Sequence, residues 1–133
     1  MTPYTIKIIT PEKTFFQGET TQIIAKTTTG NVGILKGHIP YVANLVSSPF
    51  LIEVDGTLKE AAISGGIIKV SPDNVTVVTN AIEWADEIDV ARAERSKKNA
   101  EGRMKRNESQ KEFDRAEKKL KRALNRLIVA GKR

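Results

Sequence analysis

Cysteine is absent from this 133-residue sequence, histidine occurs once, and aromatic residues make up only 5% of it. Without cysteine the chain has no disulfide, no thiolate ligand for zinc or an iron–sulfur cluster, and no cysteine nucleophile. No apolar run approaches the roughly 18 residues of a membrane-spanning helix, and the first residues lack the basic and apolar regions of an export signal. The sequence therefore predicts a chain that is not exported, does not span a membrane and holds no metal centre.

Catalytic groups are equally scarce. The single histidine, His38, lies in a glycine-bounded loop without a nucleophile or a second titratable group beside it. A structural or partner-contact role is therefore the favoured interpretation of His38. Because no acid–base or nucleophile constellation is present elsewhere, we predict that the chain is not an enzyme and needs no cofactor.

Arginine, proline and glycine are distributed unevenly along the chain. All eight arginines follow residue 91, whereas all five prolines and seven of the nine glycines precede residue 73. From Ala85 onward sixteen basic residues stand against nine acidic ones, while the preceding part is nearly balanced. We therefore predict two regions, 1–84 and 85–133, of which the second needs an anionic partner.

The first region has the pattern of β-strands. Apolar and polar residues alternate with a period of two, which indicates strands buried on one face. Asp55-Gly56 is the clearest hairpin turn, because both residues tolerate the positive φ that such a turn demands. Gly65-Gly66 is followed by more strand pattern, which predicts a bulge or close backbone packing rather than a phosphate loop. Many short strands with dense turns predict a β-sandwich or barrel.

The second region has the composition of helices. The sequence predicts a first helix from near Asp86 to about Arg106, and Ser109 with Glu112 has the capping-box pattern that starts a second. The second helix carries an apolar stripe at steps of three and four, comprising Phe113, Ala116, Leu120, Ala123 and Leu127, widened by Leu124 and Ile128. The first helix offers fewer apolar positions. We therefore predict an α+β fold that ends in a two-helix antiparallel hairpin, which is conditionally docked and mobile.

Four basic residues of the second helix form a ridge: Arg115, Lys119, Arg122 and Arg126. On a helical wheel they fall within roughly 60° of one another and nearly opposite the apolar stripe. A solvated face is the ordinary interpretation of such a ridge. Neighbouring like charges repel, however, so an acidic protein surface or a phosphate would be favoured there.

Three motifs carry a resemblance to a known family. Gly33-Ile34-Leu35-Lys36-Gly37-His38-Ile39-Pro40 is followed by Ile63-Ser64-Gly65-Gly66 and then by Ile88-Asp89-Val90-Ala91-Arg92-Ala93. In that order, on a strand-rich front and a helical back, they resemble the epsilon subunit of bacterial F-type ATP synthase over essentially the whole chain. Lys36 departs from the family, which usually has proline at that position.

The resemblance implies a non-catalytic subunit of the central stalk, or rotor. Its strand domain would be a flattened β-sandwich or barrel. It would bind the gamma subunit and the ring of c subunits at the cytoplasmic face of the bacterial plasma membrane, as a peripheral component. Its hairpin would permit turnover when folded, and would inhibit ATP hydrolysis when extended along gamma into the head of alpha and beta subunits. The resemblance implies partner contacts at Asn31, His38, Arg115 and Lys119.

Family members that bind ATP use it to hold the hairpin folded. By position, this regulatory role carries over to Glu83, Ile88, Asp89, Arg92, Ala93, Arg122 and Arg126. Guanidinium groups suit phosphate oxygens, and a carboxylate suits the base or ribose. Asn99 departs from the pattern, because ATP-binding relatives can carry a further arginine there.

The alternative from a different class is a nucleic-acid-binding module that places the basic hairpin on phosphates. Nine acidic residues interleave with the basic ones, and Phe113 is the one aromatic residue of the tail that could stack on a base. The apolar stripe already uses Phe113. The residues therefore favour the rotor subunit over this alternative, with no nucleic acid among its partners.

Overall fold

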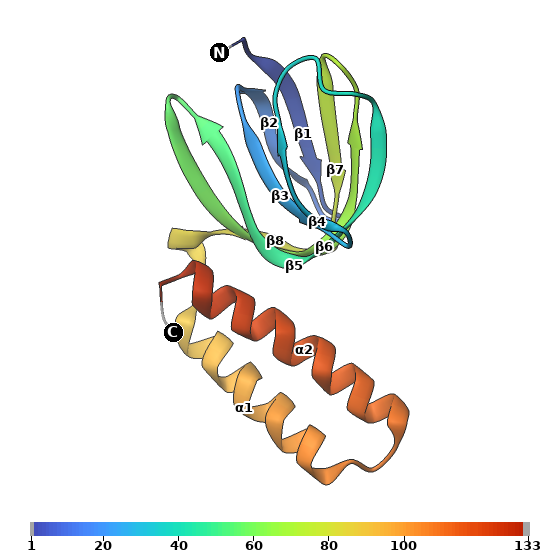
Figure 1. Ribbon diagram of the computed structural model, residues 1–133. Coiled ribbons are helices and arrows are strands. Elements are labelled where there is room, and N and C mark those ends of the chain that lie inside the picture. The colour runs from blue at the N-terminus through green and yellow to red at the C-terminus, as the bar shows by residue number, and fades with distance from the viewer. Residues whose placement is uncertain (1, 132–133) are drawn as a thin grey trace. The chain divides into compact units, whose positions relative to one another are not determined.

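The computed structural model describes residues 2–131, which form two compact units divided between Trp84 and Ala85 (Figure 1). The first unit holds the strands β1 (Tyr4–Ile9), β2 (Thr14–Thr20), β3 (Ile23–Thr27), β4 (Gly30–Ile34), β5 (Tyr41–Val54), β6 (Thr57–Val70), β7 (Asn74–Val78) and β8 (Ile82–Trp84). The second unit holds a 3-10 turn (Ala85–Glu87) and the helices α1 (Val90–Arg106) and α2 (Gln110–Val129). The predicted α+β fold class is confirmed.

The strands follow the order β2-β1-β7-β6-β5-β3-β4, with β8 paired to β6 beside this path. Neighbouring strands are antiparallel except β1 and β7, which run parallel. Figure 1 shows how the strands curve around an interior, as expected of a β-sandwich. The inward positions of all layers form one apolar core, whose fully buried members include Ile6, Ile8, Ile23, Phe50, Ile52, Ile63, Ile68 and Val77.

The hairpin of β5 and β6 joins the two layers of the β-sandwich. Each of these strands is 14 residues long and contributes one part to each layer. One half of β6 pairs with β8 and the other half with β7. Between those halves lie Gly65 and Gly66, with φ of 100° and 135°. The pairing of β5 with β6 skips a rung there, between Leu45↔Gly66 and Ser47↔Ser64. β6 thus exchanges one partner strand for another around Gly65-Gly66, while its register with β5 is the same on both sides.

The other end of this hairpin is the predicted two-residue turn. Asp55 and Gly56 have φ of 51° and 84°, as the sequence pattern requires. Glu53 holds the turn, because its carboxylate accepts hydrogen bonds from the Gly56 and Thr21 backbone N–H groups. These donors, of which Gly56 has the largest effect, lower the pKa of Glu53.

Helix α1 begins later than the sequence predicts. Asp86 and Glu87, which suggested the first turn, belong to the separate 3-10 turn. Asp89 is the N-cap of α1: its backbone is extended, and its Oδ1 accepts a hydrogen bond from the Arg92 backbone N–H at 3.0 Å. The acidic residues therefore lie before the helix, and the carboxylate of Asp89 satisfies one of the free N–H groups of its first turn.

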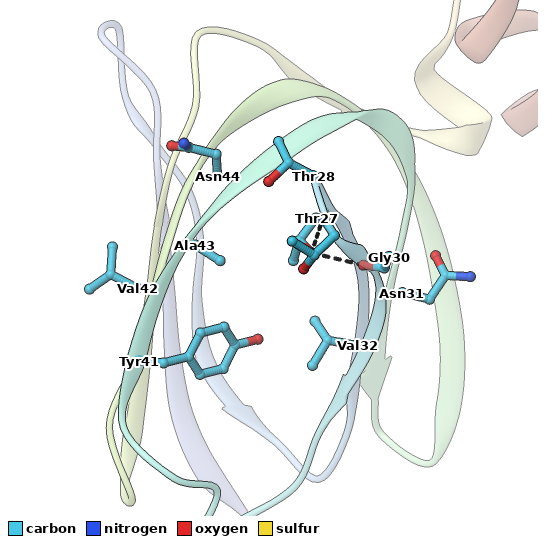
Figure 2. Close-up of a pocket in the computed structure, with 10 residues that line it drawn as sticks. Thr27, Thr28, Gly30, Asn31, Val32, Tyr41, Val42, Ala43 and Asn44 are labelled. Carbon is cyan, nitrogen blue, oxygen red and sulfur yellow. Dashed lines mark hydrogen bonds between the residues drawn. The ribbon is translucent and has the colours of Figure 1, made fainter.

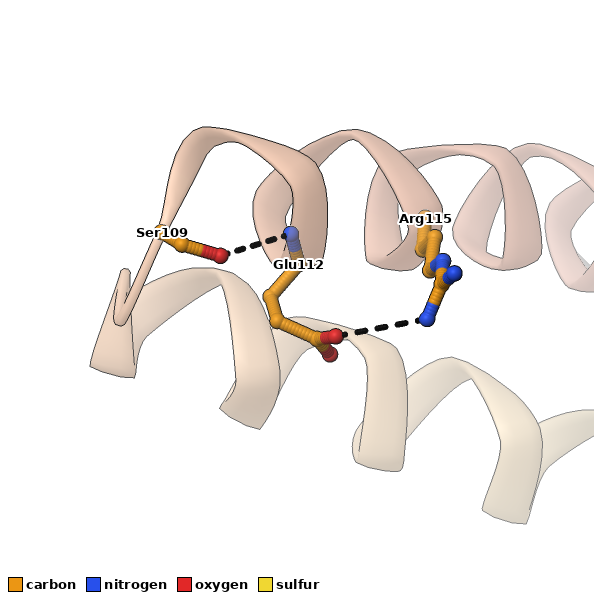
Figure 3. A network of polar contacts seen from close by, with 3 residues as sticks. All are labelled: Ser109, Glu112 and Arg115. Atoms are coloured by element: carbon orange, nitrogen blue, oxygen red, sulfur yellow. Dashed lines mark hydrogen bonds and ion pairs between the residues drawn. The ribbon is translucent and has the colours of Figure 1, made fainter.

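The end of α1 and the start of α2 agree with the prediction. Asn107 closes α1 in the left-handed conformation, and Ser109 caps α2 by accepting a hydrogen bond from the Glu112 N–H (Figure 3). The second half of the expected capping box is replaced, because the Glu112 carboxylate pairs with Arg115 at 3.4 Å. A three-residue connection between the helices makes the pair an antiparallel hairpin.

Small residues form the contact between the helices. Ala93 and Ala100 of α1 and Ala116 and Ala123 of α2 are each 1% exposed. Alanine permits a close helix approach at low side-chain entropy cost. The apolar stripe of α2 is consequently buried along its alanine edge, whereas Leu124 and Ile128 on its other edge stay exposed.

Candidate functional site

A groove of about 270 Å³ runs beside the alanine contact of the helical unit. From α1 it is lined by Ser96, Asn99, Ala100 and Arg103, and from α2 by Lys119, Arg122, Ala123 and Arg126. The helical wheel suggested that the basic ridge lies opposite the contact between the helices, but the structure places it elsewhere. It borders that contact, because α1 packs on the alanine edge of the stripe rather than on its centre.

The lining of this interhelical groove is cationic. It contains four basic side chains and no carboxylate. Within residues 2–131, no carboxylate lies at ion-pair distance from Arg103, Lys119 or Arg122. Cations gathered in a concave wall repel one another and raise the local concentration of anions. The groove is therefore suited to a multiply charged anion.

The two walls of the groove have the same spacing. On α1, Arg92, Ser96, Asn99 and Arg103 follow at steps of four, three and four and so lie on one face. Because the helices are antiparallel, Arg92 and Arg126 lie toward the base of the hairpin, whereas Arg103 lies toward the loop that joins the helices. Cations thus follow one another along the groove from base to tip.

Two acidic residues at the tip of the hairpin lie in a hollow next to the groove. Arg103 also borders a smaller hollow with Arg106, Glu108 and Glu112. Glu108 pairs with Arg106 at 3.7 Å, and Glu112 pairs with Arg115 at 3.4 Å. Both carboxylates therefore already have basic partners of their own.

The seven predicted nucleotide residues divide between the units. Glu83 lies on β8 in the strand unit, opposite Ala62 of β6. The other six lie in the helical unit, where Arg122 and Arg126 line the groove. Ile88 and Asp89 precede α1, and Asp89 is engaged as its N-cap rather than in an ion pair with the Arg92 guanidinium.

The remaining members of that set have distinct positions on α1. Ala93 is buried in the helix contact, and Arg92 is exposed on the groove face one turn after the cap. Sequence reasoning missed Ser96 and Arg103, and it placed Lys119 in the basic ridge and among the partner contacts but not in the nucleotide set. The spacing of Arg92 to Arg103 could have indicated them, but only once the antiparallel partner helix was placed beside it.

The outer face of the strand unit carries an exposed apolar patch, formed by Val42, Ile67 and Val78. These side chains lie on the neighbouring strands β5, β6 and β7 and are 66%, 48% and 50% exposed. Ile67 pairs directly with Val78, and their chain neighbours Ile68 and Val77 point into the core. Contiguous exposed apolar side chains of this kind mark a protein interaction surface.

The loop between β4 and β5 holds His38. Its backbone N–H closes a turn on the Leu35 carbonyl at 3.2 Å, and its ring lies 5.2 Å from that of Tyr41. Lys36 occupies the position where proline is usual, and the turn is closed nonetheless. Ile39, next to His38, is 78% exposed, so this loop is a second candidate contact surface.

Asn31 borders a cleft of about 580 Å³ between the β3–β4 hairpin and the first residues of β5 (Figure 2). The Tyr41 hydroxyl faces this cleft, and within residues 2–131 it is buried without a hydrogen-bond partner. Burial raises the pKa of the Tyr41 phenol. Asn31 lines the cleft and His38 does not, so these two predicted contact residues belong to separate features, the cleft and the neighbouring loop.

The structure also bears on metals and membranes. No helix in the described range is long and apolar enough to cross a bilayer. Among residues 2–131 no cluster of three or more histidine, aspartate or glutamate side chains could hold a metal ion.

Two family models match the chain in sequence order. Residues 3–85 match the β-sandwich domain of the ATP synthase delta/epsilon chain, and residues 86–131 match the long α-helix domain of the same chain. Together these matches cover nearly the whole sequence.

Individual relatives agree with the family models. The chain is 59% identical to the ATP synthase epsilon chain of Ruminococcus albus, and the alignment covers 100% of both sequences. Its fold resembles a chain of the Euglena gracilis mitochondrial ATP synthase OSCP/F1/c-ring assembly, with a TM-score of 0.77, 21% identity, and coverage of 89% of this chain and 75% of that one. It also resembles a chain of the Tetrahymena thermophila mitochondrial ATP synthase central stalk and c-ring, with a TM-score of 0.54, 18% identity, and coverage of 63% and 68%.

Proposed function

This chain belongs to the delta/epsilon chain family of ATP synthase, and we propose that it is a rotor subunit whose helical hairpin regulates ATP hydrolysis in response to ATP. As an epsilon chain it is a non-catalytic subunit of that enzyme rather than an enzyme itself. The observation that carries the regulatory part is the interhelical groove, whose four cations come from both helices.

The strand unit supplies attachment to the rotor. The patch of Val42, Ile67 and Val78 and the loop around His38 offer exposed apolar surface on a rigid sheet. Such surface suits stable docking to a protein partner, here the gamma subunit and the c-ring. The two fold relatives come from assemblies named for the c-ring, one of them also for the central stalk, and this supports the choice of partners. The subunit would then be peripheral to the membrane, on its cytoplasmic face.

The helical unit supplies the regulation. The residues of its helices that are only 1% exposed are all alanines, which bury little apolar area compared with leucine or phenylalanine. The exposed Leu124 and Ile128 remain available to another surface. A hairpin held so weakly can exchange its internal contact for one with gamma and the alpha and beta subunits, and its basic side chains suit an acidic partner.

ATP favours the folded hairpin in this proposal, because its phosphates would bind cations from both walls of the groove. Separating α1 from α2 would divide the site, so only the folded hairpin binds tightly. A ligand at about one hundred times its dissociation constant stabilises the bound form by roughly 2.7 kcal/mol. That is enough to move a hairpin equilibrium that is near balance.

Arg122→Ala tests the regulation in the assembled ATPase. With the wild-type chain, rising ATP should relieve inhibition of hydrolysis, whereas removal of residues 85–133 should abolish inhibition at every ATP concentration. Arg122→Ala should require at least about ten-fold more ATP for relief, since a charge-assisted bond to phosphate contributes about 1.5–3 kcal/mol. The measurement is the initial hydrolysis rate after preincubation at graded ATP concentrations.

Lys118→Ala provides the matched control, because Lys118 is exposed on the same helix and does not line the groove. It removes one positive charge and should leave the ATP dependence at the wild-type value. An unchanged ATP dependence in Arg122→Ala would remove the nucleotide from the proposal. Equal rates for the full chain and the chain lacking 85–133 would remove the inhibition as well.

A further inference from the structure

We propose that the cleft between the β3–β4 hairpin and β5 binds an extended, uncharged segment of the protein that covers the patch of Val42, Ile67 and Val78, and that this segment pairs with free strand edges as an added strand. The inference rests on the proposed attachment to the rotor and gives it a mode of recognition. The patch holds the partner by apolar contact, whereas the cleft holds its main chain, assisted by the hydroxyl of Tyr41.

One wall of the cleft is a strand without a partner on its outer side. β4 is the last strand of the sheet and, within residues 2–131, pairs only with β3. In a two-residue hairpin the residues that flank the turn, here Thr27 and Gly30, exchange hydrogen bonds. Because such pairs alternate with non-hydrogen-bonded pairs along an antiparallel ladder, the backbone N–H and C=O groups of Asn31 and Gly33 point away from β3.

The opposite wall is a second free edge. Residues 41–44 pair with β6 on one side, whereas β3 pairs with β5 only from Leu45 onward. The Asn44 carbonyl accepts a hydrogen bond from the Thr28 N–H at 3.1 Å, so the backbone groups of Asn44 point away from β6. Those of Val42, two residues earlier, point the same way and face no strand in the described part of the chain. Two unpaired edges thus border one cleft.

The lining of the cleft indicates which segment suits these edges. None of its ten residues is charged, and none is proline. Charged side chains and proline are common means of protecting an exposed edge from pairing with another chain. The Tyr41 hydroxyl faces the cleft and lacks a hydrogen-bond partner, so a peptide N–H or C=O group there would satisfy it (Figure 2). An uncharged segment in extended conformation supplies such groups and adds to an open edge as a strand.

Val42 connects the cleft to the patch. Its side chain is 66% exposed, and the residue belongs both to the patch and to the lining of the cleft. A protein that covers the patch therefore also reaches the mouth of the cleft. The occupant is accordingly a segment of that same protein.

Residue-resolved amide hydrogen exchange of the full chain, alone and bound to a gamma–c-ring assembly, tests the proposal. Amide groups at a free strand edge exchange readily, because no backbone hydrogen bond protects them. Pairing with an added strand should slow exchange at Asn31 and Gly33 by at least about ten-fold in the bound chain. Contact through the patch alone would slow exchange on β5, β6 and β7 and leave these two amides unchanged.

Two substitutions of Asn31 separate backbone from side-chain contacts. Asn31→Pro removes the N–H group at the free edge and should raise the dissociation constant of the assembly at least about ten-fold. Asn31→Ala is the matched control, since it keeps that N–H and shortens a side chain that points away from Tyr41 (Figure 2). It should bind within about two-fold of wild type.

Tyr41→Phe removes only the hydroxyl and should weaken binding about five-fold, as expected for the loss of one hydrogen bond. Thermal melting of each free variant checks the fold, and if Asn31→Pro does not fold, the exchange data and Tyr41→Phe decide. Unchanged exchange at Asn31 and Gly33 in the bound chain, equal losses from the two Asn31 variants, or wild-type binding by Tyr41→Phe would overturn the inference while leaving the attachment intact. A wild-type chain that does not bind the assembly would overturn the proposed attachment and this inference together.

Discussion

Gly66 lies where β6 passes the end of β7 more closely than a side chain allows. A Cβ atom at this position would stand 2.2 Å from the Val78 carbonyl oxygen, and the φ of Gly66 is 135°. Both the steric clash and the backbone conformation therefore require glycine. Because Val78 belongs to the exposed apolar patch, the close approach at Gly66 also fixes part of that surface.

Gly66→Ala should lower the free energy of unfolding by about 2–4 kcal/mol, since a strained φ and an overpacked contact each cost about 1–3 kcal/mol. Urea denaturation followed by circular dichroism measures this change. Gly33→Ala is the control, because Gly33 is also in a strand but has no atom within 4 Å of its added Cβ. Equal stabilities of the two variants would contradict the close approach.

The sequence predicted a bulge or close backbone packing at Gly65-Gly66, but not which of the two. A strand pattern that continues past two glycines is compatible with both, and the structure shows close backbone packing, with no register shift between β5 and β6. The contact with Val78 was beyond prediction, because it joins residues whose strands first had to be placed in one sheet. Asp55-Gly56 was fully predictable, since the chemistry of a two-residue turn is contained in the two residues themselves.

At the scale of elements, α1 shows how a local pattern can mislead. Asp86, Glu87 and Asp89 are all compatible with a helix start, and composition alone does not rank them. The structure selects Asp89, whose extended backbone allows its side chain to reach the Arg92 N–H. Asp89 thus performs a structural task within a motif that the family resemblance associates with ATP.

Asp89→Ala and Asp89→Asn test the capping role of Asp89 separately from any role in ATP binding. Asparagine keeps a capping oxygen, so only alanine should destabilise the hairpin, by about 1 kcal/mol. Thermal melting of the full chain, followed by circular dichroism in the absence of nucleotide, should show loss of helical signal at lower temperature for Asp89→Ala alone. Ser109→Ala should behave like Asp89→Ala, because Ser109 caps α2 in the same way. Equal melting of all four chains would contradict the capping role.

At the scale of the whole molecule, the two units rely on different interactions. The strand unit has a continuous apolar core and presents apolar side chains outward at the patch. The helical unit has an alanine contact and a cationic groove. Attachment should therefore depend on apolar burial and be nearly insensitive to salt, whereas regulation should depend on charge and weaken as salt increases.

Ile67→Asp tests attachment, because it places a carboxylate in the centre of the patch on an exposed position that the core does not use. The variant should fold with a wild-type melting temperature but bind a gamma–c-ring assembly at least about ten-fold more weakly, since burying an unpaired charge costs several kcal/mol. Co-purification and binding titration give the result. Leu58→Asp, an exposed apolar position at the opposite end of β6, should bind normally. Normal assembly of Ile67→Asp would exclude the patch as the docking surface.

The two-part organisation followed from the sequence because arginine, proline and glycine are separated along the chain. The interhelical groove could not be predicted from the sequence, for a physical reason. A helical wheel shows the faces of one helix, but it does not show which edge of a broad apolar stripe its partner will cover. Here α1 covers the alanine edge, which places the basic ridge beside the contact and joins Lys119 to Arg103 across it.

Because the walls of the groove belong to two helices, affinity for its ligand and the conformation of the hairpin are thermodynamically linked. Any factor by which the ligand favours the closed hairpin must equal the factor by which closure raises affinity for the ligand. Partner subunits that hold the helices apart would therefore weaken ligand binding by the same ratio in which the ligand weakens their hold. The affinity measured inside the assembly, divided by that of the isolated chain, would then report the free energy with which the rotor and the catalytic head pull the hairpin open.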